Sequence, residues 1–180
     1  MHILRLCRQF AVTLALGAAL AAPALAQPRG PTTPEEAARI VQLAAAANQD
    51  PLGVMTSSDG RWFEKWADDV PDYQFGPDKG VAWAVTTGAA KGAFKRVLRF
   101  QHTLSAAAFQ VQHHVADPRK NDADMQAKTL AGIEGLLRAY EALLASDPAI
   151  RTPQMDQALA ARASGTLAAF VQALPPMPAR

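Results

Sequence analysis

Cysteine is almost absent from this sequence: the one cysteine, Cys7, lies among the first 26 residues. The rest of the chain therefore has no disulfide, no thiolate metal site and no cysteine nucleophile. Long apolar runs are lacking too: the run from Phe10 to Leu20 is shorter than the roughly 20 residues that a membrane-spanning helix needs, and no later stretch is apolar for long enough without a charge. We therefore expect no transmembrane segment in the mature chain.

The first 26 residues have the pattern of a secretory signal peptide. Two basic residues, Arg5 and Arg8, precede an apolar run from Phe10 to Leu20, and the small-residue motif that ends at Ala26 suits cleavage. We expect cleavage near Ala26 and a mature chain that is periplasmic or secreted.

A surplus of charge of either sign is also lacking. The whole chain holds 18 basic and 16 acidic residues, and the expected signal contains two of the basic residues and none of the acidic ones. The mature chain is therefore neutral, which gives it no general electrostatic attraction to nucleic acid or to anionic lipid. We expect no nucleic-acid partner.

Residues 33–174 are expected to form a single all-α domain, between a flexible lead-in at 27–32 and a flexible tail at 175–180. A capping box at Thr33 and Glu36 begins a short first helix. Three longer stretches then repeat apolar residues at steps of three and four, over 89–115, 122–145 and 152–174. Three such helices joined by short polar loops predict a small up-and-down bundle.

The long helices are expected to share one apolar core, because their helical periods match. Its predicted members are Val97, Leu104, Val111, Leu130, Ile133, Leu137 and Leu167. Ile133 lies in the middle of its stripe, so this position is the most direct test of the predicted helix faces.

The segment between the first helix and the long ones is rich in turn signals. Residues 61–69 predict a short helix that places Trp62 and Trp66 on one face, and a hairpin turning at Asp59-Gly60 is the alternative. Residues 81–87 fit either a helix or a strand, and we favour the helix.

Signatures of catalysis are scarce. No serine stands in the Gly-x-Ser-x-Gly turn of a nucleophilic hydrolase. The acidic residues of segment 59–78 are close enough in sequence to supply a carboxyl pair for hydrolysis, although such sites need a shaped cleft. The aspartate-rich run from Asp117 is not a calcium loop, because Arg119 and Lys128 occupy positions that must supply oxygen ligands.

Three histidines, His102, His113 and His114, raise the hypothesis of a metal or haem site. His102 and His113 share a face of the expected helix, but eleven residues separate them by about 16 Å, which no single ion spans. A mixed site of His113 with Asp117 stays open, and covalent haem attachment lacks its Cys-x-x-Cys-His motif. We expect no cofactor.

The stretch from Asp59 to Trp83 has the most unusual composition, because it holds all three tryptophans and six acidic residues. Rings supply contact area and acids select cationic partners, so this stretch predicts a binding surface. The alternative is that the tryptophans fill the core. The predicted contact residues are Trp62, Trp66, Asp68, Asp69, Tyr73 and Trp83.

These patterns favour an exported, non-enzymatic helical binding protein, whose partner is an unknown protein or a small ligand and for which the acidic residues favour a cationic partner. A metal- or haem-binding bundle and a small hydrolase that uses the acidic residues of 59–78 are the alternatives. The acidic segment is expected to dock against Lys91, Lys95 and Arg99, which recur every four residues on one helical face.

Overall fold

The computed structural model describes residues 29–75, 78–86 and 89–175. Over these ranges the chain forms eight α-helices and two short 3-10 helices and has no strand, so the prediction of an all-α fold is confirmed. The elements are α1 (Pro34–Ala47), α2 (Pro51–Thr56), α3 (Ser58–Asp69), α4 (Lys79–Thr86), α5 (Phe94–His113), η1 (Pro118–Lys120), α6 (Asp122–Ser146), η2 (Pro148–Ile150), α7 (Pro153–Ala163) and α8 (Leu167–Gln172).

The expected signal, 1–26, lies outside the described residues, as does nearly all of the expected tail. The described part of the lead-in contacts the domain: Arg29 pairs with Glu36, and the backbone N–H and hydroxyl of Thr32 donate to the Asp72 carboxylate at 3.0 to 3.1 Å. No helix in the described ranges is long and apolar enough to cross a membrane.

Side-chain caps fix where most of the helices begin. The capping box at Thr33 is present, with Thr33 accepting from the Glu36 N–H and Glu36 accepting from the Thr33 N–H. Asn121, one residue before the expected Asp122, caps α6 by accepting from the N–H of Ala123 at 2.9 Å. Helix α3 begins at Ser58, so its first turn includes Asp59 and Gly60 and the alternative hairpin is wrong.

The segment that the sequence left open between helix and strand is helix α4 through Thr86. Residue 87 of that prediction lies outside the described residues. The favoured interpretation is therefore confirmed as far as the structure describes it.

The prediction of a third long helix over 152–174 is wrong, because the helix that begins at Pro153 ends at Ala163 and a separate helix begins at Leu167. Gly165 has a φ of 74°, a left-handed conformation that glycine adopts without steric cost. The N–H of Thr166 donates to the Ala161 carbonyl at 2.8 Å and that of Gly165 to the Arg162 carbonyl at 3.1 Å. These two bonds form a Schellman motif, which ends α7 and starts α8 in a new direction.

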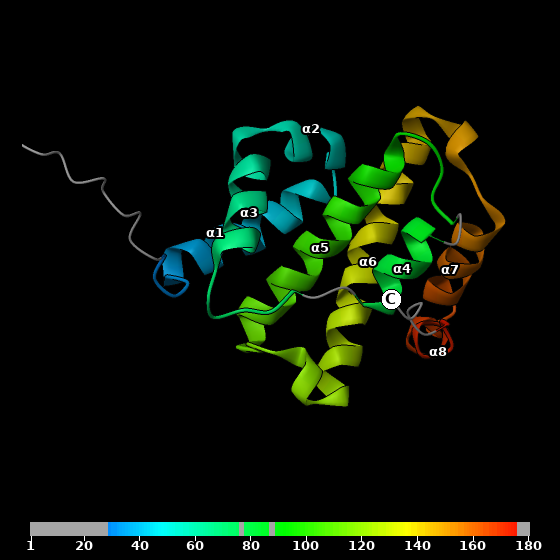
Figure 1. Cartoon of the computed structure of the whole chain (residues 1–180). Helices are drawn as coiled ribbons and strands as arrows, with labels where there is room; N and C mark the ends of the chain where they lie inside the picture. The colour runs from blue at the N-terminus through cyan, green and yellow to red at the C-terminus, as the bar shows by residue number, and fades with distance from the viewer. Residues whose placement is uncertain (1–28, 76–77, 87–88, 176–180) are drawn as a thin grey trace, which may run out of the picture.

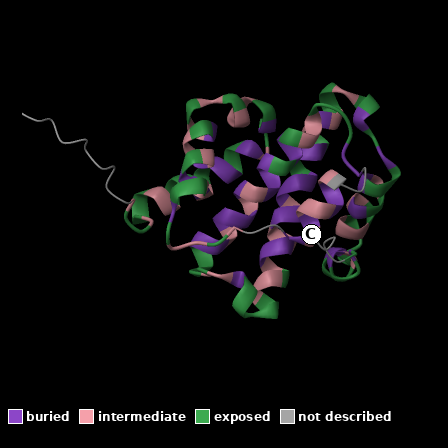
Figure 2. Cartoon of the chain, in the orientation of Figure 1, coloured by how far each residue is buried: buried purple, intermediate pink, exposed green. Residues whose placement is uncertain are grey.

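Helices α5 and α6, of 20 and 25 residues, run side by side through the centre of the molecule (Figure 1). Helices α1, α2 and α3 cover one side of α5, and α4, α7 and α8 lie on the other side, against α6. Burial is concentrated on α5 and α6, while the outer helices alternate between buried and exposed residues (Figure 2). Helix α5 is therefore enclosed on almost every side.

Because α5 is enclosed, the single predicted core is two cores. Val97, Ile133, Leu137 and Leu167 belong to a mainly aliphatic core between α4, α5, α6, α7 and α8. Leu104 and Val111 instead face a second core with α1 and α3, which is rich in rings. Leu130 is only partly buried against the first core.

Candidate functional site

The predicted aromatic surface is largely an interior. Trp66 is 2% exposed and packs against Phe63, Tyr73 and Phe75, with ring centroids 5.1 to 6.3 Å apart. Tyr73 is half-buried, and burial, with a smaller contribution from Asp72, raises the pKa of its hydroxyl. These rings pack α3 and the segment after it into the second core, so Trp66 and Phe63 expose little surface to a partner.

The other two tryptophans lie elsewhere. Trp62 is partly buried against the second core, beneath the guanidinium of Arg39, which lies 4.0 Å from the ring centroid and pairs with Asp59. Trp83, on α4, packs edge-on against Phe170 in the aliphatic core at 5.5 Å. The structure therefore does not gather the three tryptophans on one surface.

The acidic residues of the prediction remain at the surface. Asp69 pairs with Lys65 one turn earlier at 2.6 Å. Asp68 is also exposed but has no hydrogen bond or ion pair with any described residue, and its side chain lines a groove. Of the six predicted contact residues, only Asp68 belongs to this groove.

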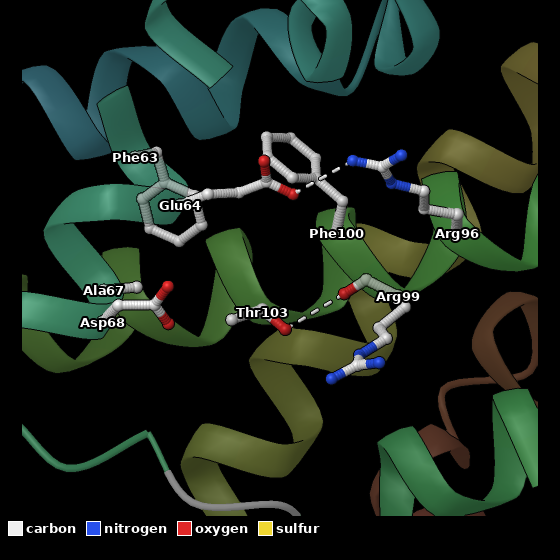
Figure 3. A pocket seen from close by; sticks show the side chains of 8 residues that line it. All are labelled: Phe63, Glu64, Ala67, Asp68, Arg96, Arg99, Phe100 and Thr103. Atoms are coloured by element: carbon white, nitrogen blue, oxygen red, sulfur yellow. Dashed lines mark hydrogen bonds and ion pairs between the residues drawn. The ribbon is translucent and has the colours of Figure 1, made fainter. Parts of the chain in front are cut away.

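The groove lies between α3 and α5 and has a volume of about 450 Å³ (Figure 3). Phe63 and Phe100 form its floor and pack edge to face at 5.7 Å. Its lining is Phe63, Glu64, Ala67 and Asp68 from α3, and Arg96, Arg99, Phe100 and Thr103 from α5. Because the floor is buried aromatic packing, the two walls are held at a fixed spacing.

The two walls carry opposite charges. Glu64 and Asp68 are one turn apart on α3, and Arg96 and Arg99 are three residues apart on α5. Glu64 faces Arg96, with 3.8 Å between Oε1 and Nη2, so that pair spans the groove at one end. At the other end the guanidinium of Arg99, like Asp68, has no ion-pair partner among the described residues (Figure 3).

The acidic segment was expected to dock against Lys91, Lys95 and Arg99, the predicted basic stripe. The structure contains only part of this contact. α3 meets α5 through Phe63 and Phe100 and through the pair of Glu64 with Arg96. Lys91 and Lys95 form no ion pair with a described acidic residue. The pairing basic residue is Arg96, which lies beside the predicted stripe.

A second charged group, which the sequence pattern did not predict, is buried where α4, α5 and α6 meet. Asp78 lies 3.4 Å from His102, between Oδ1 and Nε2, and 3.2 Å from Lys128, between Oδ2 and Nζ. All three are buried. Although burial opposes ionisation of Asp78, the pKa of this carboxyl lies below its usual value because of His102, Lys128 and the backbone N–H of Val81.

A pattern in the sequence does point to this buried group. Gly132 and Gly135 are three residues apart in α6, among residues that otherwise favour a helix. His102 and Ser105 have the same spacing on α5. A Cβ on Gly132 would lie 2.5 Å from the His102 ring, and one on Gly135 would lie 1.8 Å from the Ser105 hydroxyl. The two glycines let α5 approach α6 closely enough to enclose His102.

The residues of the metal hypothesis are not brought together. His113 and His114 are exposed, and the His113 ring lies tilted against Phe109 with 4.5 Å between the ring centroids. Both carboxylate oxygens of Asp117 accept from Arg119, at 2.7 and 2.9 Å, and this hydrogen bonding lowers the pKa of Asp117. Within the described ranges no group of three or more histidine and acidic side chains has the arrangement of a metal site.

Comparison of the chain with models of protein families, with curated proteins and with solved structures finds no match.

Proposed function

We propose that this chain is an exported, non-enzymatic binding protein, and that the α3/α5 groove holds a small zwitterion such as a free amino acid or a short peptide. The observation that carries the proposal is the pair of side chains Asp68 and Arg99, one of each sign, without ion partners on the walls of the groove. The export signal at 1–26 supplies the proposed location, periplasmic or secreted.

The chemistry of the groove matches the two ends of such a ligand. A guanidinium such as that of Arg99 accommodates a carboxylate in a forked hydrogen-bonding geometry. The carboxylate of Asp68 accepts hydrogen bonds from an ammonium group. The volume of about 450 Å³ falls within the range of small-molecule sites, roughly 300 to 1,000 Å³.

The pair of Glu64 and Arg96 closes one end of the groove. Its members are 44% and 74% exposed at 3.8 Å, so the pair is a weak one and is open to exchange with a ligand. The same contact argues for binding over hydrolysis, because it places a guanidinium opposite one of the two carboxyl groups that acid–base chemistry would use.

The proposal is tested by calorimetric titration of the mature chain with a panel of free amino acids and unblocked dipeptides. At least one member is expected to bind, and either Asp68→Asn or Arg99→Gln is expected to weaken that binding. The matched control for the acidic wall is Asp69→Asn, the neighbouring carboxylate outside the groove, and Lys91→Gln serves for the basic wall. Both controls should bind as the wild type does.

Two results would contradict the proposal. One is that no member of the panel binds. The other is that a member binds with the same affinity to the Asp68→Asn and Arg99→Gln proteins, which would place the ligand outside the groove.

A further inference from the structure

The group of Asp78, His102 and Lys128, hereafter the buried cluster, has no part in the groove. Asp78 precedes the first turn of α4, where its Oδ1 accepts from the N–H groups of Gly80 and Val81 at 3.0 and 3.1 Å. The same Oδ1 faces His102 on α5, and the other carboxylate oxygen faces Lys128 on α6. One carboxylate therefore joins three helices.

We propose that the buried cluster is a binding site for one proton, which His102 takes up from solvent in mild acid, and that its uptake separates α4 from α5 and α6. The inference does not depend on the groove or on any ligand of the groove. It follows from the charge, the space and the hydrogen bonding around the ring.

Charge is the first reason. With a neutral imidazole, the carboxylate of Asp78 and the ammonium of Lys128 cancel. Protonation of His102 leaves the buried cluster with one uncompensated positive charge. The other side chains around the adjoining cavity carry no charge; they are Phe75, Val81, Thr103 and Ala106. Burial lowers the pKa of His102 and Lys128 lowers it further, while Asp78 offsets this only in part.

Space is the second reason. The cavity beside the ring has a volume of about 10 Å³, which is the lower limit for a single water molecule. A Cβ on Gly80 would lie 2.8 Å from His102 Nε2, and one on Gly132 would lie 2.5 Å from the ring. A charged ring therefore cannot turn or gain a hydration shell unless the helices around it move apart.

Hydrogen bonding is the third reason. Neither ring nitrogen of His102 has a hydrogen-bond partner among the described residues. A proton added at Nε2 would lie near Asp78 Oδ1, which is 3.4 Å from that nitrogen and already caps the first turn of α4. The imidazolium and the N-terminus of α4 then compete for one acceptor. Helix α4 has eight residues and is shorter than α5 and α6, so we expect α4 to be the helix that moves away.

The linkage between proton uptake and stability has a definite sign. A free histidine has a pKa of about 6.5, so the unfolded chain gains a proton below that pH, whereas the native ring stays neutral until a lower pH. Between pH 7.5 and pH 5.5 the unfolding constant should therefore rise, by as much as about tenfold. Free carboxyl groups titrate below this window, near pH 4.

Urea denaturation of the mature chain at both pH values tests the proposal. The wild type is expected to show the rise, His102→Gln is expected to lose it, and the control His113→Gln, which changes an exposed ring, is expected to keep it. A wild type whose unfolding constant is the same at both pH values overturns the proposal, and so does a His102→Gln protein that keeps the full rise.

A second measurement uses only the wild type and so does not depend on whether the variant folds. In nuclear magnetic resonance spectra the His102 ring should take up its proton at a lower pH than a free histidine does, because burial lowers its pKa. Hydrogen exchange of the α4 amides, corrected for the intrinsic effect of pH, should become faster as His102 protonates. A native His102 that titrates at or above pH 6.5, or α4 amides whose protection does not change, would overturn the proposal.

Discussion

Opposite charges meet at two places in this molecule under very different conditions. In the groove, Glu64 and Arg96 are 3.8 Å apart with side chains 44% and 74% exposed. In the buried cluster, Asp78 and Lys128 are 3.2 Å apart with side chains 3% and 2% exposed. Water and salt screen the pair of Glu64 with Arg96, so it contributes little to stability. The pair of Asp78 with Lys128 is buried, so solvent cannot compensate either charge when its partner is removed.

Because their exposure differs, the two groups of charges suit different roles. The groove charges are solvated in the free protein, so a ligand can replace their water at small cost. The interior charges pair with one another, and Asp78 also accepts hydrogen bonds from the N–H groups at the start of α4. A change in the interior should therefore alter folding, whereas a change in the groove should alter binding.

The largest effect is expected for Asp78→Asn. Asparagine keeps an oxygen that can cap α4 but removes the negative charge that faces Lys128. Breaking a buried ion pair from one side costs about 3 to 5 kcal/mol, and we expect a loss of that order in the free energy of unfolding. Urea denaturation at neutral pH measures it. A loss below about 1 kcal/mol would show that the interior pair behaves like the exposed one.

Ile133→Ala is expected to come next. Ile133 is fully buried on α6 and lies next to Gly80 of α4, so it belongs to the apolar wall that keeps water from the buried cluster. The substitution should cost about 2 to 5 kcal/mol through lost burial and a cavity. Leu52→Ala, at an exposed position, is the control. A cost within about half a kcal/mol at Ile133 would contradict the packing described above.

In the groove, the expected effect is on affinity. Asp68→Asn should abolish the preference of the protein for an unblocked peptide over the same peptide acetylated at its amino end. Arg99→Gln should abolish the preference over the peptide amidated at its carboxyl end. Each should weaken binding of the unblocked peptide by about tenfold, or 1.4 kcal/mol. If each variant lost both preferences equally, the two side chains would not be reading separate ends of the ligand.

Arg96→Gln is expected to have the smallest effect on stability. It removes the exposed pair with Glu64, and pairs of this kind contribute about 0 to 1 kcal/mol. The free energy of unfolding should change by no more than that. The small part of its salt dependence that comes from the pair of Glu64 with Arg96 should be lost. A loss comparable to that of Asp78→Asn would remove the distinction between the two groups.

The sequence predicted the features that depend on neighbouring residues. The capping box at Thr33, the helix over 61–69 and the two long helices follow from local spacing, and the structure contains them. The break at Gly165 was missed because the apolar residues on both sides keep one helical period across it. A single glycine in the left-handed conformation was enough to end the helix.

The buried cluster depends on residues that are far apart in sequence, which explains why it was missed. Asp78 lies just before α4, His102 on α5 and Lys128 on α6, and each alone looks like a solvated polar side chain. The groove was missed for the same reason. Only Asp68 of its acidic wall was a predicted contact residue, and which basic residues of α5 would face that wall depended on the rotation of α5 between two cores.

The central claim is that the solvated charges of the groove are the ones that bind a ligand. Chemical-shift mapping tests it most directly: the mature chain, labelled with ¹⁵N, is titrated with the tightest-binding member of the amino-acid and dipeptide panel. The largest shifts should fall on residues 63–68 of α3 and 96–103 of α5, while α1, α7 and α8 stay unchanged. Shifts centred on the shallow apolar surface around Ala37, Val41 and Val111, or on α7 and α8, would contradict it.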